Sequence, residues 1–263
     1  MKPVALTIAG SDPSGGAGIQ ADLKTFHQFG VYGEAVITLV TVQNTQRVSR
    51  VECLPAELVL EQLQAVLEDI PPQAAKTGAL GNAAIIEALA QAAERFTFPL
   101  VVDPVMVSKH GAPLLAPEAR KALQDRLLPL AYLVTPNIPE AEVLTGLRIR
   151  TVDDMRKAAE QLCQSGTHAV VVKGGHMTGE AVDVLCVGRE CHLLATPRVS
   201  TPHTHGTGCT FSAAITAALA RGLPLREAVE VAKRYLYQAI QTHPGLGHGS
   251  GPVNHHAPVE WIS

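Results

Sequence analysis

Residues 4–29, VALTIAGSDPSGGAGIQADLKTFHQF, contain the pattern that decides the fold. The apolar run Val4–Ala9 is short and contains β-branched residues, which predicts a buried strand rather than a helix. It leads into the glycine-rich loop Gly10–Asp22, and a helical pattern of apolar residues then predicts a helix over Ala17–Phe29. A buried strand that passes through a glycine loop into a helix is typical of α/β proteins.

The same alternation continues along the rest of the chain. Further strands are predicted at Glu34–Val42, Ala74–Thr77, Leu100–Val102, Tyr132–Thr135 and Ala169–Lys173, followed by a hairpin of Ala181–Val187 and Glu190–Ala195. Further helices are predicted at Pro55–Asp69, Asn82–Arg95, Pro117–Leu127, Pro139–Thr145, Val152–Ser165, Thr210–Arg221 and Leu225–Thr242. No linker or repeat divides the sequence. We therefore expect a single α/β domain over residues 1–263, with a central, mostly parallel sheet flanked by helices on both faces.

Composition excludes several classes of protein. The 263 residues are 46% hydrophobic, which excludes a disordered chain, and the net charge of −3 offers no basic face for nucleic acid. No uninterrupted apolar stretch reaches the roughly 18 residues of a transmembrane helix. The opening MKPVALTIAG is too short an apolar run for a signal peptide. We expect a cytoplasmic protein whose partners are neither nucleic acid nor membrane.

The cysteines and histidines give no sign of a disulfide framework or a zinc site. Five scattered cysteines, an odd number, argue for a reducing compartment. Cys186 and Cys191 flank a predicted turn, where we expect them to serve packing. His203 and His205 form a spaced pair but lack a suitable third ligand, so a zinc site is disfavoured.

Ligands of open α/β sheets bind at the carboxyl ends of the strands, so the loops there are the candidate ligand-binding segments. Gly16-Ala17-Gly18 begins a G-x-G-x-x-G/A string after a strand, as in dinucleotide-binding proteins. That motif expects an acidic residue at the end of the second strand, but the strand ends in Gln43, and Glu34 lies at its opposite end. The P-loop string G-x-x-x-x-G-K-[ST] is absent. Dinucleotide binding is disfavoured, and a glycine loop that lets a ligand approach the backbone is favoured.

Residues 205–214, HGTGCTFSAA, predict an anion site. Flexible glycines lead directly into a helix, so free N–H groups and the positive end of the helix dipole face one point. Cys209 lies in this turn. A helix amino terminus can lower the pKa of a thiol, which would make Cys209 a proton acceptor or a positioning group.

Three more loops place polar residues at the same edge of the sheet. They contribute Asp103, the pair Asn137 and Glu140, and Lys173 in KGGH. Each alone has an ordinary structural explanation: Asp103 as a turn former, Asn137 as a helix cap, Glu140 as a carboxylate that complements a helix dipole, and Lys173 as a solvated charge. Their convergence on an anion site is difficult to explain by chance and indicates a functional site.

Seven strings, in order from Ala5 to about His256, carry a resemblance to a known family. They are TIAGSDPSGGAGIQADLKTF, VITLVTVQNT, VDPVMVSKHG, LVTPNIPEAE, VVKGGH, THGTGCTFSAA and HGSGPVNHH. The sequence resembles the hydroxymethylpyrimidine kinase/phosphomethylpyrimidine kinase family of thiamine biosynthesis, within the ribokinase-like superfamily. The resemblance implies phosphorylation of 4-amino-5-hydroxymethyl-2-methylpyrimidine and then of its monophosphate, with ATP and Mg²⁺, by a homodimer.

The resemblance also implies roles for individual residues. The anion hole and catalytic turn are matched by Gly206, Thr207, Gly208 and Cys209; the substrate side by Gln43, Gly10, Asp22, Ala79 and Val105; the ATP side by Lys173 and Asn137; and the metal side by Glu140 and Asp103. Cys209 stands where related enzymes have an aspartate base. Many family members have a methionine where this chain has Ala79, which leaves more room beside the substrate ring.

Two alternatives remain open at this point. Pyridoxine or pyridoxal kinase activity would use the same phosphate machinery on a similar heterocycle. Gln43 favours the aminopyrimidine, because its amide can pair with a donor–acceptor edge. A ligand-binding sensor without catalysis is disfavoured, because it has less need of both an anion hole and the carboxylate of Glu140.

Overall fold

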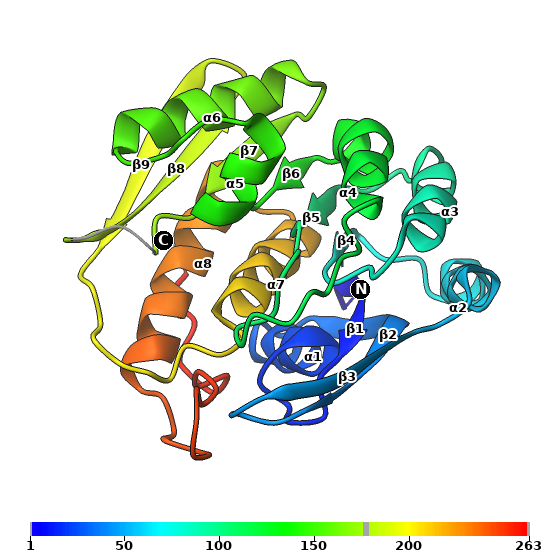
Figure 1. The fold of residues 1–263 in the computed structure, drawn as a ribbon, viewed down its shortest axis with the longest axis horizontal. Coiled ribbons are helices and arrows are strands. Elements are labelled where there is room, and N and C mark those ends of the chain that lie inside the picture. The colour runs from blue at the N-terminus through cyan, green and yellow to red at the C-terminus, as the bar shows by residue number, and fades with distance from the viewer. Residues whose placement is uncertain (1, 176–178, 262–263) are drawn as a thin grey trace.

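The computed structural model describes residues 2–175 and 179–261, and one nine-stranded sheet runs through them (Figure 1). The strands are β1 Val4–Ser11, β2 Tyr32–Gln43, β3 Val48–Cys53, β4 Ala74–Thr77, β5 Leu100–Val102, β6 Leu133–Val134, β7 Ala169–Val172, β8 Ala181–Val187 and β9 Glu190–Thr196. Their order is β3-β2-β1-β4-β5-β6-β7-β8-β9. The pairs from β2 to β7 are parallel, whereas β3, β8 and β9 pair antiparallel. The predicted mostly parallel sheet is confirmed.

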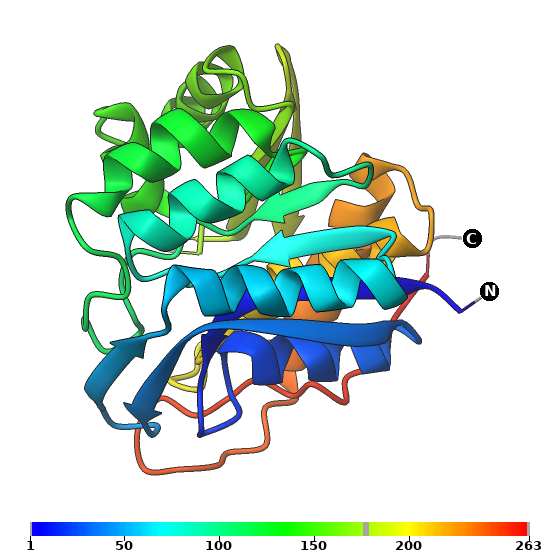
Figure 2. The same ribbon diagram turned by 90° about the vertical axis from the view of Figure 1, so that its right-hand side faces the viewer.

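Helices cover both faces of the sheet, as predicted. One face carries α1 Gly18–Gln28, α7 Thr207–Ala220 and α8 Leu225–Gln241; the other carries α2 Ala56–Asp69, α3 Ala83–Ala93, α4 Ala119–Ala122, α5 Ile138–Thr145 and α6 Val152–Gln164. In Figure 2, α2 and α3 lie nearest the viewer, in front of the strands. Leu6 and Ile8 of β1 join the core on the α3 side, and Ala5 joins the core on the α7 side. Alternate residues of this strand are therefore buried on opposite faces. Within the described residues, no helix has both the length and the apolar character needed to span a bilayer.

Two local predictions differ from the structure. Strand β3 was not predicted, because it is a half-exposed edge strand without an apolar run. The expected helix Pro117–Leu127 is α-helical only over α4 and continues as a π-helical turn at Leu123–Leu127, and a 3₁₀ turn at Leu128–Leu130 follows beyond the predicted end. The proline at position 129 cannot donate a backbone hydrogen bond, which is consistent with the end of the helix there.

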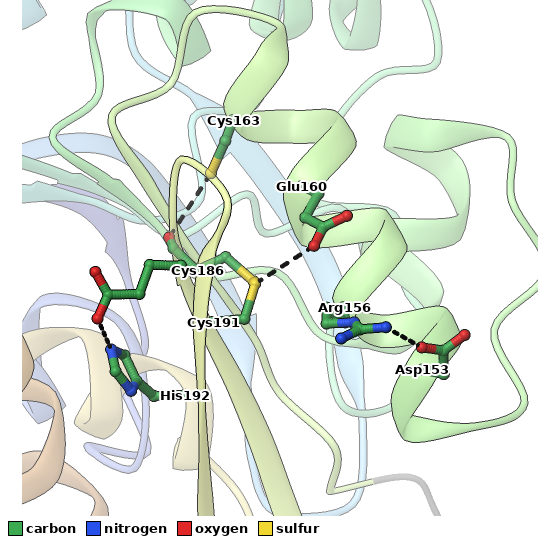
Figure 3. Close-up of a disulfide and its surroundings, with 8 residues drawn as sticks. Asp153, Arg156, Glu160, Cys163, Cys186, Cys191 and His192 are labelled. Carbon is green, nitrogen blue, oxygen red and sulfur yellow. Dashed lines mark hydrogen bonds and ion pairs between the residues drawn. A yellow bond between two sulfur atoms is a disulfide. The ribbon is translucent and has the colours of Figure 1, made fainter.

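The cysteine prediction is wrong at one pair. Cys186 of β8 and Cys191 of β9 are joined by a disulfide (Figure 3). The tight hairpin places these two residues directly opposite each other in register. Cys163 of α6 lies beside them, with its thiol 3.7 Å from the Cys186 carbonyl oxygen. Backbone pairing continues on both sides of the disulfide, so strand pairing also contributes to the hairpin register.

The carboxyl-terminal segment packs against α7 and α8 through a buried histidine. His255 Nε2 lies 3.2 Å from the Thr210 hydroxyl, and the Tyr235 hydroxyl donates to the His255 carbonyl oxygen at 3.0 Å. Burial, assisted by the positive charge of Lys24, lowers the pKa of His255 to about 4. The folded protein therefore holds this ring neutral in mildly acidic solution.

We expect His255 to contribute to acid sensitivity. The unfolded chain binds a proton at His255 near pH 6.5, but the folded chain binds it only near pH 4, so stability falls as pH falls between these values. The loss from this residue should reach about 2.5 kcal/mol by pH 4.5. Urea unfolding at pH 7.5 and pH 4.5 should show a smaller loss for His255→Gln than for the unsubstituted chain. The exposed neighbour gives the control: His256→Gln should behave as the unsubstituted chain, and equal losses in all three proteins would contradict the assignment.

Candidate active site

The carboxyl ends of the parallel strands open into a cavity of about 530 Å³. This volume is typical of small-molecule sites. Every predicted site residue except Asp22 lines it. These residues are Gly10, Gln43, Ala79, Asp103, Val105, Asn137, Glu140, Lys173, Gly206, Thr207, Gly208 and Cys209. The KGGH loop that begins at Lys173 ends at His176, which lies outside the described residues.

The anion site is the uncapped amino terminus of α7. Gly206 precedes the helix with φ of +79°, and no side chain caps the first turn. The first N–H groups of a helix have no acceptor within it, so those of Gly208 and Cys209 are available to a ligand in the cavity. An anion is favoured at this point by these donors and by the helix dipole.

Two glycine loops meet in backbone contact behind this site. A Cβ at Gly206 would lie 1.7 Å from the Gly16 carbonyl oxygen, which no side chain could tolerate. Gly18 has φ of +59°, and a Cβ there would lie 2.3 Å from the Gly10 carbonyl oxygen. Glycine is required at these positions for two reasons: a Cβ would collide with a neighbouring carbonyl oxygen, and the backbone has a positive φ. The contact fixes the start of α7 against the loop that follows β1.

Cys209 is held as a neutral thiol. Burial raises its pKa to about 12, and the nearby ammonium of Lys76 offsets only part of this effect. The prediction that the helix terminus lowers the pKa of this thiol is wrong for the structure, because desolvation outweighs the favourable charges. Cys209 is therefore suited to positioning a ligand rather than to accepting a proton.

Asp22 lies beneath the cavity wall rather than on it. Both Asp22 and Lys76 are fully buried, and the Lys76 ammonium lies 2.8 Å from Asp22 Oδ1. Thr7 donates to the other carboxylate oxygen at 2.6 Å. Burial alone would lower the pKa of Lys76, but Asp22 and other neighbouring anionic groups outweigh it and raise that pKa. Asp22, which was predicted to belong to the substrate-binding residues, does not line the cavity, and its carboxylate already has protein partners.

Beside the α7 turn, Lys173 is paired with Asp103. Their charged atoms lie 2.9 Å apart, and the Thr135 hydroxyl donates to the same carboxylate at 3.2 Å. Burial opposes the charge of Lys173, but Asp103 and Glu140 together raise its pKa. Lys173 therefore presents a permanent positive charge to the cavity.

Asn137 and Glu140 form a capping box at the start of α5. The Glu140 N–H donates to Asn137 Oδ1 at 2.9 Å, and the Asn137 N–H donates to Glu140 Oε2 at 2.8 Å. Burial raises the pKa of Glu140 to about 7, against the opposing effect of Lys173. The ordinary capping roles of these residues are thus present, and the same geometry holds both side chains at the cavity.

The donor set suits magnesium bound together with a nucleotide. Asp103 and Glu140 place carboxylate oxygens at the same cavity. In the described part of the chain, no group of three or more His, Cys, Asp or Glu could hold a metal by itself. Mg²⁺ usually keeps several waters and binds one or two carboxylates plus substrate phosphates. The residues present therefore fit a cation that arrives with its nucleotide.

Two residues without a predicted role in the site, Asp12 and His205, also line the cavity beside Gln43. His205 Nε2 lies 2.7 Å from Asp12 Oδ2 and 3.1 Å from Gln43 Nε2, and all three residues line the cavity. His205 Nδ1 is buried without a partner, so Nε2 carries the proton and donates it to Asp12. Asp12 and His205 are 193 positions apart. Both stand inside the quoted glycine motifs, but only the fold joins them.

Comparison with known proteins identifies the family. A family model described as phosphomethylpyrimidine kinase matches residues 12–254. The chain belongs to this family. It is 48% identical over 256 residues to a hydroxymethylpyrimidine/phosphomethylpyrimidine kinase of Bacillus subtilis strain 168. The matched region covers 96% of this chain and 94% of that protein.

Solved structures confirm the ribokinase-like fold of this kinase. A phosphomethylpyrimidine kinase from Clostridium difficile 630 is 48% identical, with a TM-score of 0.81 over 91% of this chain and all of that one. An ADP complex of a Bacillus subtilis pyridoxal kinase is 40% identical, with a TM-score of 0.90 over 98% of both chains. Kinases for two different heterocycles therefore share this architecture.

Glycine-to-alanine substitutions should distinguish glycines that are needed for folding around the anion site from a glycine that is needed for binding the anion. Gly222→Ala, with φ of +87° and nothing within 4 Å, should cost about 1–2 kcal/mol of unfolding free energy through conformation alone. Gly206→Ala should cost more, because it adds the clash with Gly16. A Cβ at Gly208 would lie 3.4 Å from Lys173 Nζ and 3.6 Å from Asp103 Oδ2, which are ordinary contact distances, so Gly208→Ala should fold normally.

The kinase with Gly208→Ala should nevertheless lose at least about tenfold in kcat/KM for ATP, because the methyl group enters the space in front of the helix N–H groups. Urea unfolding and steady-state kinetics of the three variants provide the test. Normal turnover by Gly208→Ala, or equal stability of Gly206→Ala and Gly222→Ala, would contradict this account.

Proposed function

We propose that this kinase transfers the γ-phosphoryl group of ATP to the hydroxymethyl group of 4-amino-5-hydroxymethyl-2-methylpyrimidine, and then to the resulting monophosphate, in thiamine biosynthesis. The observation that carries the proposal is the joining of the α7 turn, Lys173 and Glu140 in one cavity with Gln43. In this proposal the α7 turn, Lys173 and Glu140 bind phosphate and magnesium, and Gln43 binds the acceptor. Family membership agrees with this assignment.

The reaction requires alignment and charge compensation. The acceptor oxygen attacks the γ-phosphorus, the bond from that phosphorus to the ADP oxygen breaks, and ADP leaves. The proton of the acceptor hydroxyl passes to an oxygen of the transferred phosphoryl group. Asp103 and Glu140 would hold Mg²⁺, which neutralises phosphate charge when it is bound. Lys173 and the N–H groups of Gly208 and Cys209 stabilise the oxygens of the migrating group. Such a transfer needs little covalent participation by the protein.

The acceptor subsite is formed by Gln43 with Ala79, Val105 and the loop at Gly10. Because His205 donates its Nε2 proton to Asp12, the Gln43 amide is best satisfied with its oxygen toward that N–H group, which places its NH₂ group about 3.3 Å from the Thr41 hydroxyl oxygen, an acceptor for one of its two protons. Its NH₂ group can then donate to a ring nitrogen of the acceptor. Asp12 is therefore a positioning residue: by holding His205, it orients the Gln43 amide toward the acceptor ring.

Pyridoxal is the second candidate acceptor. Two observations favour it: the likeness to a pyridoxal kinase of Bacillus subtilis, and the small Ala79 side chain on the cavity wall.

We also propose a cytoplasmic homodimer, on the basis of composition and family resemblance. In a reducing compartment the Cys186 and Cys191 pair would be present as thiols.

Removal of the Cys209 thiol should lower turnover at least tenfold, about 1.4 kcal/mol of barrier. The expected cause is loss of alignment, so the rate of the unsubstituted kinase should not rise with thiol ionisation between pH 7 and pH 9. Steady-state kinetics of Cys209→Ala and a pH profile of kcat provide the measurements. Cys163→Ala, outside the cavity, is the control and should retain full turnover. Unchanged kcat in Cys209→Ala would remove the residue from the mechanism.

Acceptor choice is tested by product analysis with ATP and Mg²⁺. The pyrimidine alcohol should give the diphosphate as end product, with a larger kcat/KM than pyridoxal. Gln43→Leu should reduce that preference, because the amide contact is worth about 1 kcal/mol or more. Faster turnover of pyridoxal by the unsubstituted kinase would reverse the assignment, and chelation of Mg²⁺ should abolish both reactions.

A further inference from the structure

Arg120 in α4 is a cavity residue with no assigned role. Its side chain lines the same cavity as Asn137, Glu140 and Val143 of the α5 region. Its Nε atom is buried and has no hydrogen-bond partner. Buried donors are almost always paired, so an orphaned guanidinium nitrogen beside a ligand cavity calls for a ligand.

The other charges of the cavity wall are already compensated. Asp12 pairs with His205 at 2.7 Å, and Asp103 pairs with Lys173 at 2.9 Å. Glu140 accepts the N–H of Asn137 and feels the charge of Lys173.

Two cationic residues of the cavity wall, Arg120 and Lys109, differ from these compensated groups. Within residues 2–175 and 179–261, neither Arg120 nor Lys109 forms an ion pair with a carboxylate. Lys109 stands in a loop closed by bonds from the Ser108 N–H to the Ala112 carbonyl oxygen and from the Leu114 N–H to the Met106 carbonyl oxygen. The chain then runs from this loop into α4, which carries Arg120. Two uncompensated cations therefore border the same side of the cavity.

We propose that Arg120, assisted by Lys109, binds a phosphoryl group and forms a second anion subsite besides the α7 turn. The planar guanidinium presents several N–H donors in a fixed arrangement that matches phosphate oxygens. Val143 and the apolar stem of Arg120 line the cavity beside the guanidinium.

A second subsite follows from the charge that the reaction must accommodate. The alcohol acceptor is neutral, but the monophosphate acceptor brings between one and two extra negative charges next to the migrating group. Lys173 and the α7 turn face one phosphoryl group. This inference rests on the proposed function, since only a kinase that accepts both substrates places two phosphoryl groups, besides the rest of the nucleotide, in one cavity.

The test compares Arg120→Gln and Arg120→Lys with the control Arg126→Gln. Arg126 is exposed, lies in the next helical turn and does not line the cavity. KM and kcat are measured for the alcohol, the monophosphate and ATP, each at saturation of the other substrate. The unsubstituted kinase is assayed first: if it does not phosphorylate the monophosphate at all, the proposed function fails, independently of Arg120.

Arg120→Gln should raise KM for the monophosphate at least tenfold and leave KM for the alcohol within about threefold, and Arg120→Lys should fall between. An equal rise of KM for ATP with both acceptors would also support a phosphoryl contact, to the nucleotide instead of the acceptor. Unchanged KM values for the monophosphate and ATP, or a change shared by Arg126→Gln, would overturn the proposal. If Arg120→Gln lowers the melting temperature by more than a few degrees, Arg120→Lys, which keeps the positive charge, provides the test: its KM for the monophosphate should exceed that of Arg126→Gln while its KM for the alcohol does not, and equal values would overturn the proposal.

Discussion

The contact between Gly206 and the Gly16 carbonyl oxygen determines where the cavity can form. It brings the loop after β1 and the start of α7 so close that no Cβ fits between them. The helix terminus therefore points at one side of the cavity, and Cys209 lies near the buried pair of Asp22 and Lys76. Neither loop could hold this geometry alone, because a glycine loop without a partner has many accessible conformations.

Charge compensation within the protein explains why so many ionisable groups can share one small space. Buried carboxylates and ammonium groups are tolerated when each has a partner at hydrogen-bond distance. Asp22 with Lys76, Asp103 with Lys173, and Asp12 with His205 satisfy that condition. Available to a phosphate, besides the positive charge that Lys173 shares with Asp103, are the dipole of α7 and the side chains of Arg120 and Lys109. Cys209 adds no charge, so it does not repel the incoming anion.

The sequence predicted the sheet, its helices and most of the cavity wall, because these depend on local patterns. Short apolar runs mark buried strands, and loops after such strands meet at one edge of the sheet by topology. The errors arose where a role depends on a partner far along the chain. The sequence does not show that Lys76 pairs with Asp22, and the Asp12 bond to His205 links positions with no sequence signal between them.

Other errors had more local causes. The edge strand β3 lacks the apolar run that a buried strand requires. The Cys186–Cys191 bond depends on hairpin register, which spacing alone does not determine. The pKa of Cys209 depends on how deeply the thiol is buried, whereas the sequence shows only the favourable helix terminus. Arg120 carried no recognisable motif at all, and only its unpaired nitrogen in the folded chain distinguishes it.

The cavity wall is assembled from separate stretches of chain, and this division has an evolutionary consequence. Gln43 and Ala79 come from β2 and the loop after β4, whereas Lys173 and the α7 turn come from the second half of the sequence. Mutations in the first group can alter which heterocycle is accepted while phosphoryl transfer stays intact. Divergence of substrate preference within one lineage then requires few steps, consistent with a pyridoxal kinase that retains the architecture at 40% identity.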